Sequence, residues 1–333
     1  MMKMILWTVV GLLMGLVVIV EIGLRSRYGF GNPLLYTTDP EIGYLIAPNQ
    51  RTRRNGNLIE INEYSMRSQG VTAVPEVKTL RVLMVGDSIL NGGWWTDQSN
   101  TISNLIAQGL KQKIPREFTQ AEVLNASANS WGPRNELAYL RKFGNFGAQI
   151  IILVINTDDL FAIAPYSVVV GRDRNYPDRK PGLALVEVYQ RYLQKPAAIP
   201  ELAKLQQEPG DRVGINLEAI KHIHEFAIAH QSRFLLIMTP LKRELGTPGP
   251  RDYEFKARER LQTFTNQENI PYIDVLPIFN HHPQPETLYH DHIHLNVQGN
   301  MLIRDILTAK IQELFVPVSS HLPWESSSAN SYK

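Results

Sequence analysis

Short apolar runs and amphipathic segments alternate along the last two thirds of the chain. Five runs have the length and branched side chains of buried strands, at residues 80–86, 121–125, 149–156, 233–239 and 271–275. Helical periodicity follows at about 100–113, 133–145, 215–230, 252–269 and 296–315. Such alternation is typical of a parallel sheet with helices on both faces. The pattern therefore predicts an α/β fold whose site lies at the carboxyl ends of the strands.

An almost unbroken apolar stretch runs from Ile5 to Leu24. At about 1.5 Å per residue, a helix of this length crosses the roughly 30 Å hydrocarbon core of a bilayer. A cleaved signal peptide has a shorter apolar region and a small-residue cleavage site, whereas this stretch leads into Gly23-Leu24-Arg25-Ser26-Arg27. We therefore expect residues 1–27 to be an uncleaved membrane anchor, a single transmembrane helix.

The charges that flank this stretch do not settle its orientation. Lys3 and the α-amino group precede it, and Arg25 and Arg27 follow it, so the positive-inside rule favours neither direction. A lone N-terminal anchor on a folded domain is most simply explained by export. We therefore expect a cytoplasmic N-terminus and a main domain outside the cytoplasm.

Composition changes along the chain predict its other parts. Residues 28–79 are rich in Gly, Pro, Asn and Arg and predict an extension that packs against the main domain, residues 80–318. Residues 161–214 interrupt the alternation between the third and fourth strands. This long insertion is either a lid or binding element or a solvated excursion with surface helices. The tail, residues 319–333, is expected to be disordered.

Charge and cysteine content exclude several function classes. The chain has 34 Lys and Arg against 32 Asp and Glu, a net charge of +2, so no strong positive field indicates a nucleic-acid partner. It has no cysteine, which excludes disulfides, thiolate-bound zinc, iron–sulfur clusters and a cysteine nucleophile. We expect no cofactor, and the sequence indicates no particular protein partner.

Ser88 is the candidate nucleophile. It follows Gly86 and Asp87 at the carboxyl end of the first predicted strand, so its hydroxyl should stand at the rim of the cleft. A free backbone N–H beside a nucleophile is half of an oxyanion hole. Because Gly-Asp-Ser is common by chance, this tripeptide needs a partner motif before it indicates catalysis.

Asp291 and His294 form the second candidate element, after the last predicted strand. An imidazole can take the proton of the Ser88 hydroxyl, and a carboxylate on its other nitrogen orients the ring and stabilises the imidazolium. The histidines near this motif also suggest a metal site: His281, His282, His290, His292 and His294. They lack helical ligand spacing of the His-Glu-x-x-His kind, so we expect no metal.

Gly86-Asp87-Ser88 and Asp291-x-x-His294, on either side of five strand-like runs, resemble the SGNH (GDSL) hydrolase superfamily. The resemblance covers about residues 80–315. It implies a three-layer α/β/α sandwich with a flavodoxin-like, five-stranded parallel sheet, a Ser-His-Asp triad, and ester or acyl-transfer chemistry on lipids, carbohydrates or small esters. The anchor and the stretch Asn62-Glu-Tyr-Ser-Met-Arg67 also resemble membrane-attached bacterial members. The domain would then be periplasmic or on the outer face of the membrane.

The second family block, usually Asn-x-Gly-x-x-Gly, reads Asn125-Ala-Ser-Ala-Asn-Ser-Trp-Gly132 here. Aligned on Asn125, Ser130 takes the place of the glycine whose N–H binds the oxyanion. The N–H survives, but glycine's freedom at positive φ is lost, so the loop is expected to adopt a conformation open to serine. Gly132 is the alternative donor if the loop is shifted.

The third family block, usually Gly-x-Asn-Asp, reads Asn156-Thr157-Asp158-Asp159. Asp158 therefore replaces the side-chain amide that donates to the oxyanion, and an ionised carboxylate only accepts hydrogen bonds. Losing one such donor costs on the order of 100- to 1000-fold in rate. Three explanations stay open: Asp158 is protonated, Asn156 replaces it, or activity is weak.

Three tryptophans, Trp94, Trp95 and Trp131, follow the nucleophile or lie in the second block. Their rings either stack against sugars or acyl chains in the cleft, or pack these loops onto the core. The first possibility favours a carbohydrate substrate slightly.

The sequence predicts a serine esterase that uses Ser88, His294 and Asp291, with oxyanion contacts at Ser88, Ser130 and position 158. The substrate is an ester, such as an O-acyl group of a carbohydrate or a lipid. An O-acyltransferase that modifies an envelope or secreted polysaccharide is the first alternative, because both reactions begin with the same acyl-enzyme. A weakly active or inactive SGNH-like binding or scaffold protein is the second, and Asp158 supports it.

Overall fold

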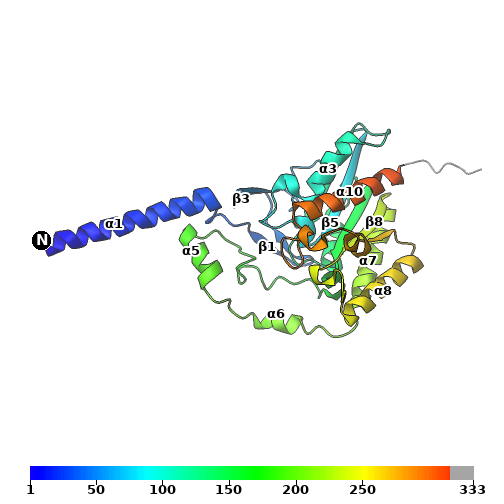
Figure 1. Ribbon diagram of the computed structural model, residues 1–333. Helices are drawn as coiled ribbons and strands as arrows, with labels where there is room; N and C mark the ends of the chain where they lie inside the picture. The colour runs from blue at the N-terminus through cyan, green and yellow to red at the C-terminus, as the bar shows by residue number, and fades with distance from the viewer. Residues whose placement is uncertain (316–333) are drawn as a thin grey trace, which may run out of the picture.

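The computed structural model describes residues 1–315; the tail at 319–333, predicted to be disordered, lies outside the described residues. A five-stranded parallel sheet lies between two helical layers (Figure 1). Its strands are β5 (Thr79–Gly86), β6 (Gln120–Ser127), β7 (Ile150–Asn156), β8 (Arg233–Thr239) and β9 (Tyr272–Asp274). Their order, β6-β5-β7-β8-β9, is flavodoxin-like. The predicted three-layer α/β/α fold is confirmed.

Alternating strand residues fill two separate hydrophobic cores. Val82 and Met84 of β5 point to the face covered by α3 (Ile102–Gln112) and α10 (Val297–Leu314). Leu83 and Val85 point to the opposite face. The helices on that face are α4 (Pro133–Phe143), α7 (Arg212–Ala229) and α8 (Asp252–Gln267). Because both faces are buried, the central strands are unbroken apolar runs, which is why the sequence revealed them.

The long helices begin at side-chain caps. Thr101 caps α3, and Asn296 caps α10 by accepting hydrogen bonds from the N–H groups of Gln298 and Gly299 at 2.9 and 3.1 Å. Asp211 caps α7 through the N–H of Gly214 at 3.0 Å. This cap explains why α7 begins three residues before the segment predicted from apolar periodicity alone.

The extension before the sheet folds into two antiparallel hairpins. They pair β1 (Tyr36–Asp39) with β2 (Gly43–Ile46), and β3 (Gln50–Arg54) with β4 (Asn57–Ile61). Their buried apolar side chains join the core under α4 and α7: Tyr36, Tyr44, Ile46, Ile59 and Ile61. The hairpins are therefore packed parts of the fold rather than a free stalk.

Arg67 ties the extension to the loop that follows the nucleophile candidate. It is fully buried and donates hydrogen bonds to the carbonyl oxygens of Asn91, Gly93 and Thr96. Burial lowers the pKa of this guanidinium to about 9, with Asp97 acting in the opposite direction. Several carbonyls of one loop thus depend on a single side chain from the extension.

The apolar N-terminal stretch forms α1 (Met2–Gly23), which continues as one wider turn over Leu24–Tyr28. It projects from the domain (Figure 1). Its apolar side chains have no protein cover. Its mean hydropathy of 2.5 and its length are sufficient to cross a bilayer.

Before α7 begins at Arg212, the insertion at 161–214 contains only short helices, and it passes both the first hairpin and the base of α1. The N–H of Tyr36 donates to Pro177 O at 2.8 Å, for example. Within residues 1–315 the short helices are α2 (Ser88–Asn91), α5 (Ala184–Val188), α6 (Pro200–Leu205) and α9 (Leu276–Asn280). Turns of 3-10 helix lie at Gln98–Asn100, Thr157–Phe161, Lys242–Glu244 and Pro285–Leu288.

Buried carboxyl groups lie beneath the carboxyl edge of the sheet. Glu136 on α4 is fully buried, and neither of its oxygens accepts a hydrogen bond from residues 1–315. Burial, followed by the negative charge of Asp87, raises the pKa of Glu136 well above its usual range. The pKa of buried Asp159 is raised for the same two reasons. These groups oppose folding once they ionise.

We expect Glu136→Gln to stabilise the protein at high pH. A carboxyl whose pKa is raised by folding stabilises the folded state fully below its unfolded value near 4.5, and this contribution is lost as pH rises through the folded pKa. The variant should therefore be more stable than the wild type at about pH 8, by roughly 1–3 kcal/mol, and this advantage should shrink toward pH 5. Urea unfolding of the full chain in detergent measures it. Exposed Glu117→Gln is the control, and an equal pH dependence in the wild type and Glu136→Gln would refute the expectation.

Candidate active site

Ser88 stands at the carboxyl edge of the sheet because β5 ends there and α2 begins. Asp87 caps α2 by accepting a hydrogen bond from Ile89 N–H at 2.8 Å. The turn is tight: a Cβ on Gly86 would lie 2.6 Å from Val154 O on the neighbouring strand. Glycine at this position lets the chain reverse against β7 and present the hydroxyl.

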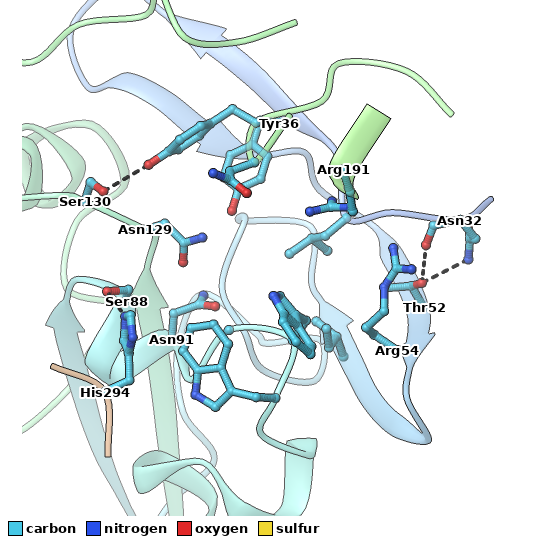
Figure 2. A pocket seen from close by; sticks show the side chains of 17 residues that line it. Asn32, Tyr36, Thr52, Arg54, Ser88, Asn91, Asn129, Ser130, Arg191 and His294 are labelled. Atoms are coloured by element: carbon cyan, nitrogen blue, oxygen red, sulfur yellow. Dashed lines mark hydrogen bonds between the residues drawn. The ribbon is translucent and has the colours of Figure 1, made fainter. Parts of the chain in front are cut away.

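His294 and Asp291 lie in the loop before α10, far from Ser88 in sequence, and this loop brings them beside Ser88. Asp291 Oδ1 accepts the N–H groups of Ile293 and His294 at 2.9 and 2.8 Å, which shapes the loop. Asp291 Oδ2 lies 2.8 Å from His294 Nδ1, and His294 Nε2 lies 2.8 Å from Ser88 Oγ (Figure 2). The structure thus brings together the three residues that the sequence analysis selected as nucleophile, base and orienting carboxylate.

Electrostatics and packing favour this arrangement. Burial alone would raise the pKa of Asp291, but hydrogen bonds from the His294 backbone and ring and from Ile293 lower it to about 2. The carboxylate is therefore ionised at neutral pH, as stabilisation of an imidazolium requires. Trp95 packs against the His294 ring at 4.4 Å between centroids and also stacks on His290 at 5.2 Å. These contacts restrict rotation of the imidazole.

Ser130 itself occupies the left-handed region, with φ +57°. The loop thus keeps the backbone geometry that glycine favours, and serine adopts it at a cost of about 1 kcal/mol. Tyr176 OH donates to Ser130 Oγ at 3.0 Å, and Tyr44 OH donates to Asn129 O at 2.6 Å. The Gly132 N–H donates to Asn135 Oδ1 at 3.1 Å, so Gly132 is not the free donor considered as the alternative.

Asp158 lies at the border of the site, with a carboxyl group where the family pattern has an amide. More than half of its side chain is exposed, and Arg243 Nη2 lies 3.9 Å from its carboxylate. Partial burial raises its pKa, and Arg243 opposes the shift. Asn156 does not replace it, because the Asn156 amide donates to Asp87 and Asp159, both at 2.9 Å.

Asn129 is a polar residue of the site that the sequence analysis missed. Its side chain points into the same pocket as Ser88 and Asn91 (Figure 2). Its Oδ1 is buried and has no hydrogen-bond partner within residues 1–315. The oxygen and nitrogen of an amide exchange places by a half-turn, so this position suits an N–H donor equally well. Its place directly before Ser130 in the second block was the available signal.

Two hollows meet at Ser88 and His294. One, of about 290 Å³, extends from these residues to Arg54 on a hairpin and Arg191 in the insertion (Figure 2). The other, of about 440 Å³, is bordered by Asp158. The candidate nucleophile Ser88 thus lies at the border of both hollows.

The tryptophans divide between the two roles considered. Trp94 is 43% exposed and, like Trp95, lines the smaller hollow. Trp131 is buried and donates from Nε1 to Tyr44 O at 3.0 Å, so it packs the second block onto the core.

The histidines near Asp291 were also considered as metal ligands. Within residues 1–315, no group of three or more His, Cys, Asp or Glu side chains has the geometry to hold a metal ion.

Three solved structures with a similar fold are distant from this chain in sequence. The lipase/acylhydrolase from Enterococcus faecalis is 16% identical, with a TM-score of 0.44 over 70% of this chain and 96% of its own. The acetylxylan esterase Axe2 from Geobacillus stearothermophilus is 14% identical, with a TM-score of 0.47 over 73% and 100%. The acetyl xylan esterase AlAXEase is 14% identical, with a TM-score of 0.48 over 69% and 99%. No curated protein is a significant sequence match.

A family model gives the decisive comparison. The model of the GDSL-like lipase/acylhydrolase family matches residues 84–302. That span covers more than half of the chain and contains Ser88, Asp291 and His294. The chain therefore belongs to the GDSL-like lipase/acylhydrolase family.

Proposed function

We propose that this protein is a serine esterase in which Ser88 is the nucleophile, His294 the general base and Asp291 the residue that orients it. The observation that carries the proposal is the pair of 2.8 Å contacts that run from Asp291 through His294 to Ser88 Oγ. Family membership supports ester hydrolysis as the reaction class.

The proposed reaction has two halves. His294 Nε2 takes the hydroxyl proton while Ser88 Oγ attacks the ester carbonyl carbon, and His294 returns that proton to the departing alcohol oxygen. The acyl group then remains as an ester of Ser88. In the second half His294 deprotonates a water, which attacks this ester, and the proton passes back to Ser88 Oγ as the acid leaves. A sugar hydroxyl in place of that water would make the product an O-acylated carbohydrate.

The proposed oxyanion hole differs from the family pattern. The Ser88 N–H lies in the first turn of α2, where helices have no internal acceptor for it. The Ser130 N–H donates to no group within residues 1–315. We add the Asn129 amide as the third donor, because Asp158 offers none. The side-chain donor to the oxyanion then comes from the second block, whereas in the family pattern it comes from the third.

The proposed substrate is an O-acyl group on a carbohydrate. Trp94 supports this choice, since its ring is 43% exposed along the hollow that starts at Ser88 and gives a sugar a face to stack on.

We further propose that α1 anchors the protein in a membrane, with the domain outside the cytoplasm. Its apolar side chains are uncovered, which is costly in water and favourable in lipid. The alternative is a signal sequence that is removed.

Removal of the nucleophile or the base should abolish activity. We expect Ser88→Ala and His294→Ala to lower the kcat for hydrolysis of p-nitrophenyl acetate by at least about 10⁴-fold, because the two groups act as a unit. His222→Ala, on the exposed side of α7, is the control and should retain wild-type activity. An unmodified protein without activity would overturn the esterase proposal and favour the binding-protein alternative.

Loss of the Asn129 amide should slow catalysis without weakening substrate binding. We expect Asn129→Ala to lower kcat about 100-fold with little change in KM, as for other oxyanion donors. Asp158→Asn, which restores the family amide, is the comparison and should change kcat far less. If Asn129→Ala kept the wild-type kcat and Asp158→Asn raised kcat above it, the missing amide at position 158 would limit the rate. Our assignment of Asn129 would then be wrong.

A further inference from the structure

One segment of the insertion turns its charged side chains toward the protein and large apolar side chains toward solvent, the opposite of an ordinary surface helix. Residues 183–193 read LALVEVYQRYL and comprise Leu183, α5 and the turn that continues it. Glu187 is buried and Arg191 lines the active-site hollow, so its charged side chains face inward. Five large apolar side chains, each at least 40% exposed, form what we call the outward face: Leu183, Val186, Tyr189, Tyr192 and Leu193. Water is a poor environment for such a face.

Buried polar contacts hold this orientation in place. Glu187 accepts a hydrogen bond from Gly31 N–H at 2.6 Å and forms ion pairs with Arg54 and with Arg191, the latter at 2.9 Å. A rotation of the segment that buried its apolar side would break the contacts of Glu187 with Gly31 and Arg54 and leave Arg54 without its carboxylate partner. The outward face is therefore built into the fold.

The segment is fastened to the end of α1. Glu21 accepts the N–H groups of Ala184 and Leu185 at 2.7 and 3.0 Å. Arg25 donates to Gly182 O at 2.9 Å. The outward face thus begins where the apolar helix ends, and Figure 1 shows α5 beside the base of α1. If α1 crosses a bilayer, these contacts place α5 at the level of the lipid headgroups.

Basic side chains border the outward face. The hollows next to Val186 and Gln194 are lined by several exposed cations: Arg174, Arg179, Lys180 and Lys195. Residues 171–195 carry six basic and three acidic side chains, and one of the acidic three is the buried Glu187. Basic side chains are attracted to an anionic membrane surface. Tyrosines are also enriched at the membrane–water interface.

We propose that the outward face of residues 183–193 lies in the headgroup layer of an anionic bilayer and holds the domain against the membrane surface. The proposal rests on the proposed anchorage by α1 and does not depend on the chemistry at Ser88. Continuity with α1 and the basic border together favour lipid over a second protein chain. Because Arg191 lines the active-site hollow from the inner side of the same segment, this hollow lies directly behind the lipid-facing surface. Substrates at the membrane surface are then within reach.

Single-cysteine labelling of the full chain tests this placement. The chain has no native cysteine, so a fluorophore can be attached at one chosen position at a time. Leu193→Cys reports on the outward face. Val17→Cys, in the middle of α1, reports on the anchor, and Ile228→Cys, 62% exposed on α7, is the matched surface control. Each labelled protein is placed in nanodiscs of anionic phospholipid, with or without lipids that carry a nitroxide quencher near the headgroup or deep in the acyl chain.

We expect the label at position 193 to shift its emission to the blue and to lose fluorescence to the shallow quencher. The label at position 17 should lose fluorescence to the deep quencher, and the label at position 228 should be unaffected. Quenching at 17 but not at 193 would overturn the proposal while leaving the anchor intact. No quenching at 17 would refute the anchor and the proposal with it.

Two further experiments test whether anionic lipid, rather than a second protein chain, covers the outward face. In zwitterionic nanodiscs we expect weaker quenching at position 193, and equal quenching would contradict the role of the basic border. In detergent without bilayer, a blue shift at position 193 that grows with protein concentration would show that a second copy of the chain covers the outward face, which would overturn the lipid assignment. The activity of these preparations on p-nitrophenyl acetate reports separately on the proposal for Ser88.

Discussion

The hydrogen bond between Ser88 and His294 joins positions 206 residues apart, and the functional account depends on it. It exists because β5 lies inside the sheet and its carboxyl end opens toward the loop that precedes α10. That loop is fastened to the strand edge at several points. Tyr289 OH donates to Pro240 O at 2.7 Å, and Lys242 N–H donates to His292 O at 3.0 Å. Packing of Trp95 on the imidazole completes the support.

The elements that could be predicted from the sequence are those whose signal is local. Buried parallel strands are unbroken apolar runs, and Asp291 and His294 lie three residues apart, so one loop positions both. The hairpins over residues 36–61 could not be predicted in the same way, because their strands mix buried with exposed polar residues and depend on the core beneath them. The role of Arg67 and the inward direction of Arg191 also arise only from long-range packing.

The structure shows which contacts the residues that depart from the family pattern make. Serine at position 130 keeps the left-handed backbone, since Tyr176 holds its hydroxyl. Asn156, which stands where the family has glycine, uses its amide to bind Asp87 and Asp159 beneath the nucleophile. Asp158 is left at the rim beside Arg243. The residues that depart from the family pattern in the second and third blocks thus each have polar contacts of their own.

The central claim is that Ser88 is an activated nucleophile, and a fluorophosphonate probe tests it most directly, because such probes react with activated serines. We expect the probe to modify the full chain at Ser88, as located by peptide mass spectrometry, and His294→Ala to remove the modification. An unmodified wild-type protein, or modification at another serine that persists in Ser88→Ala, would contradict the account.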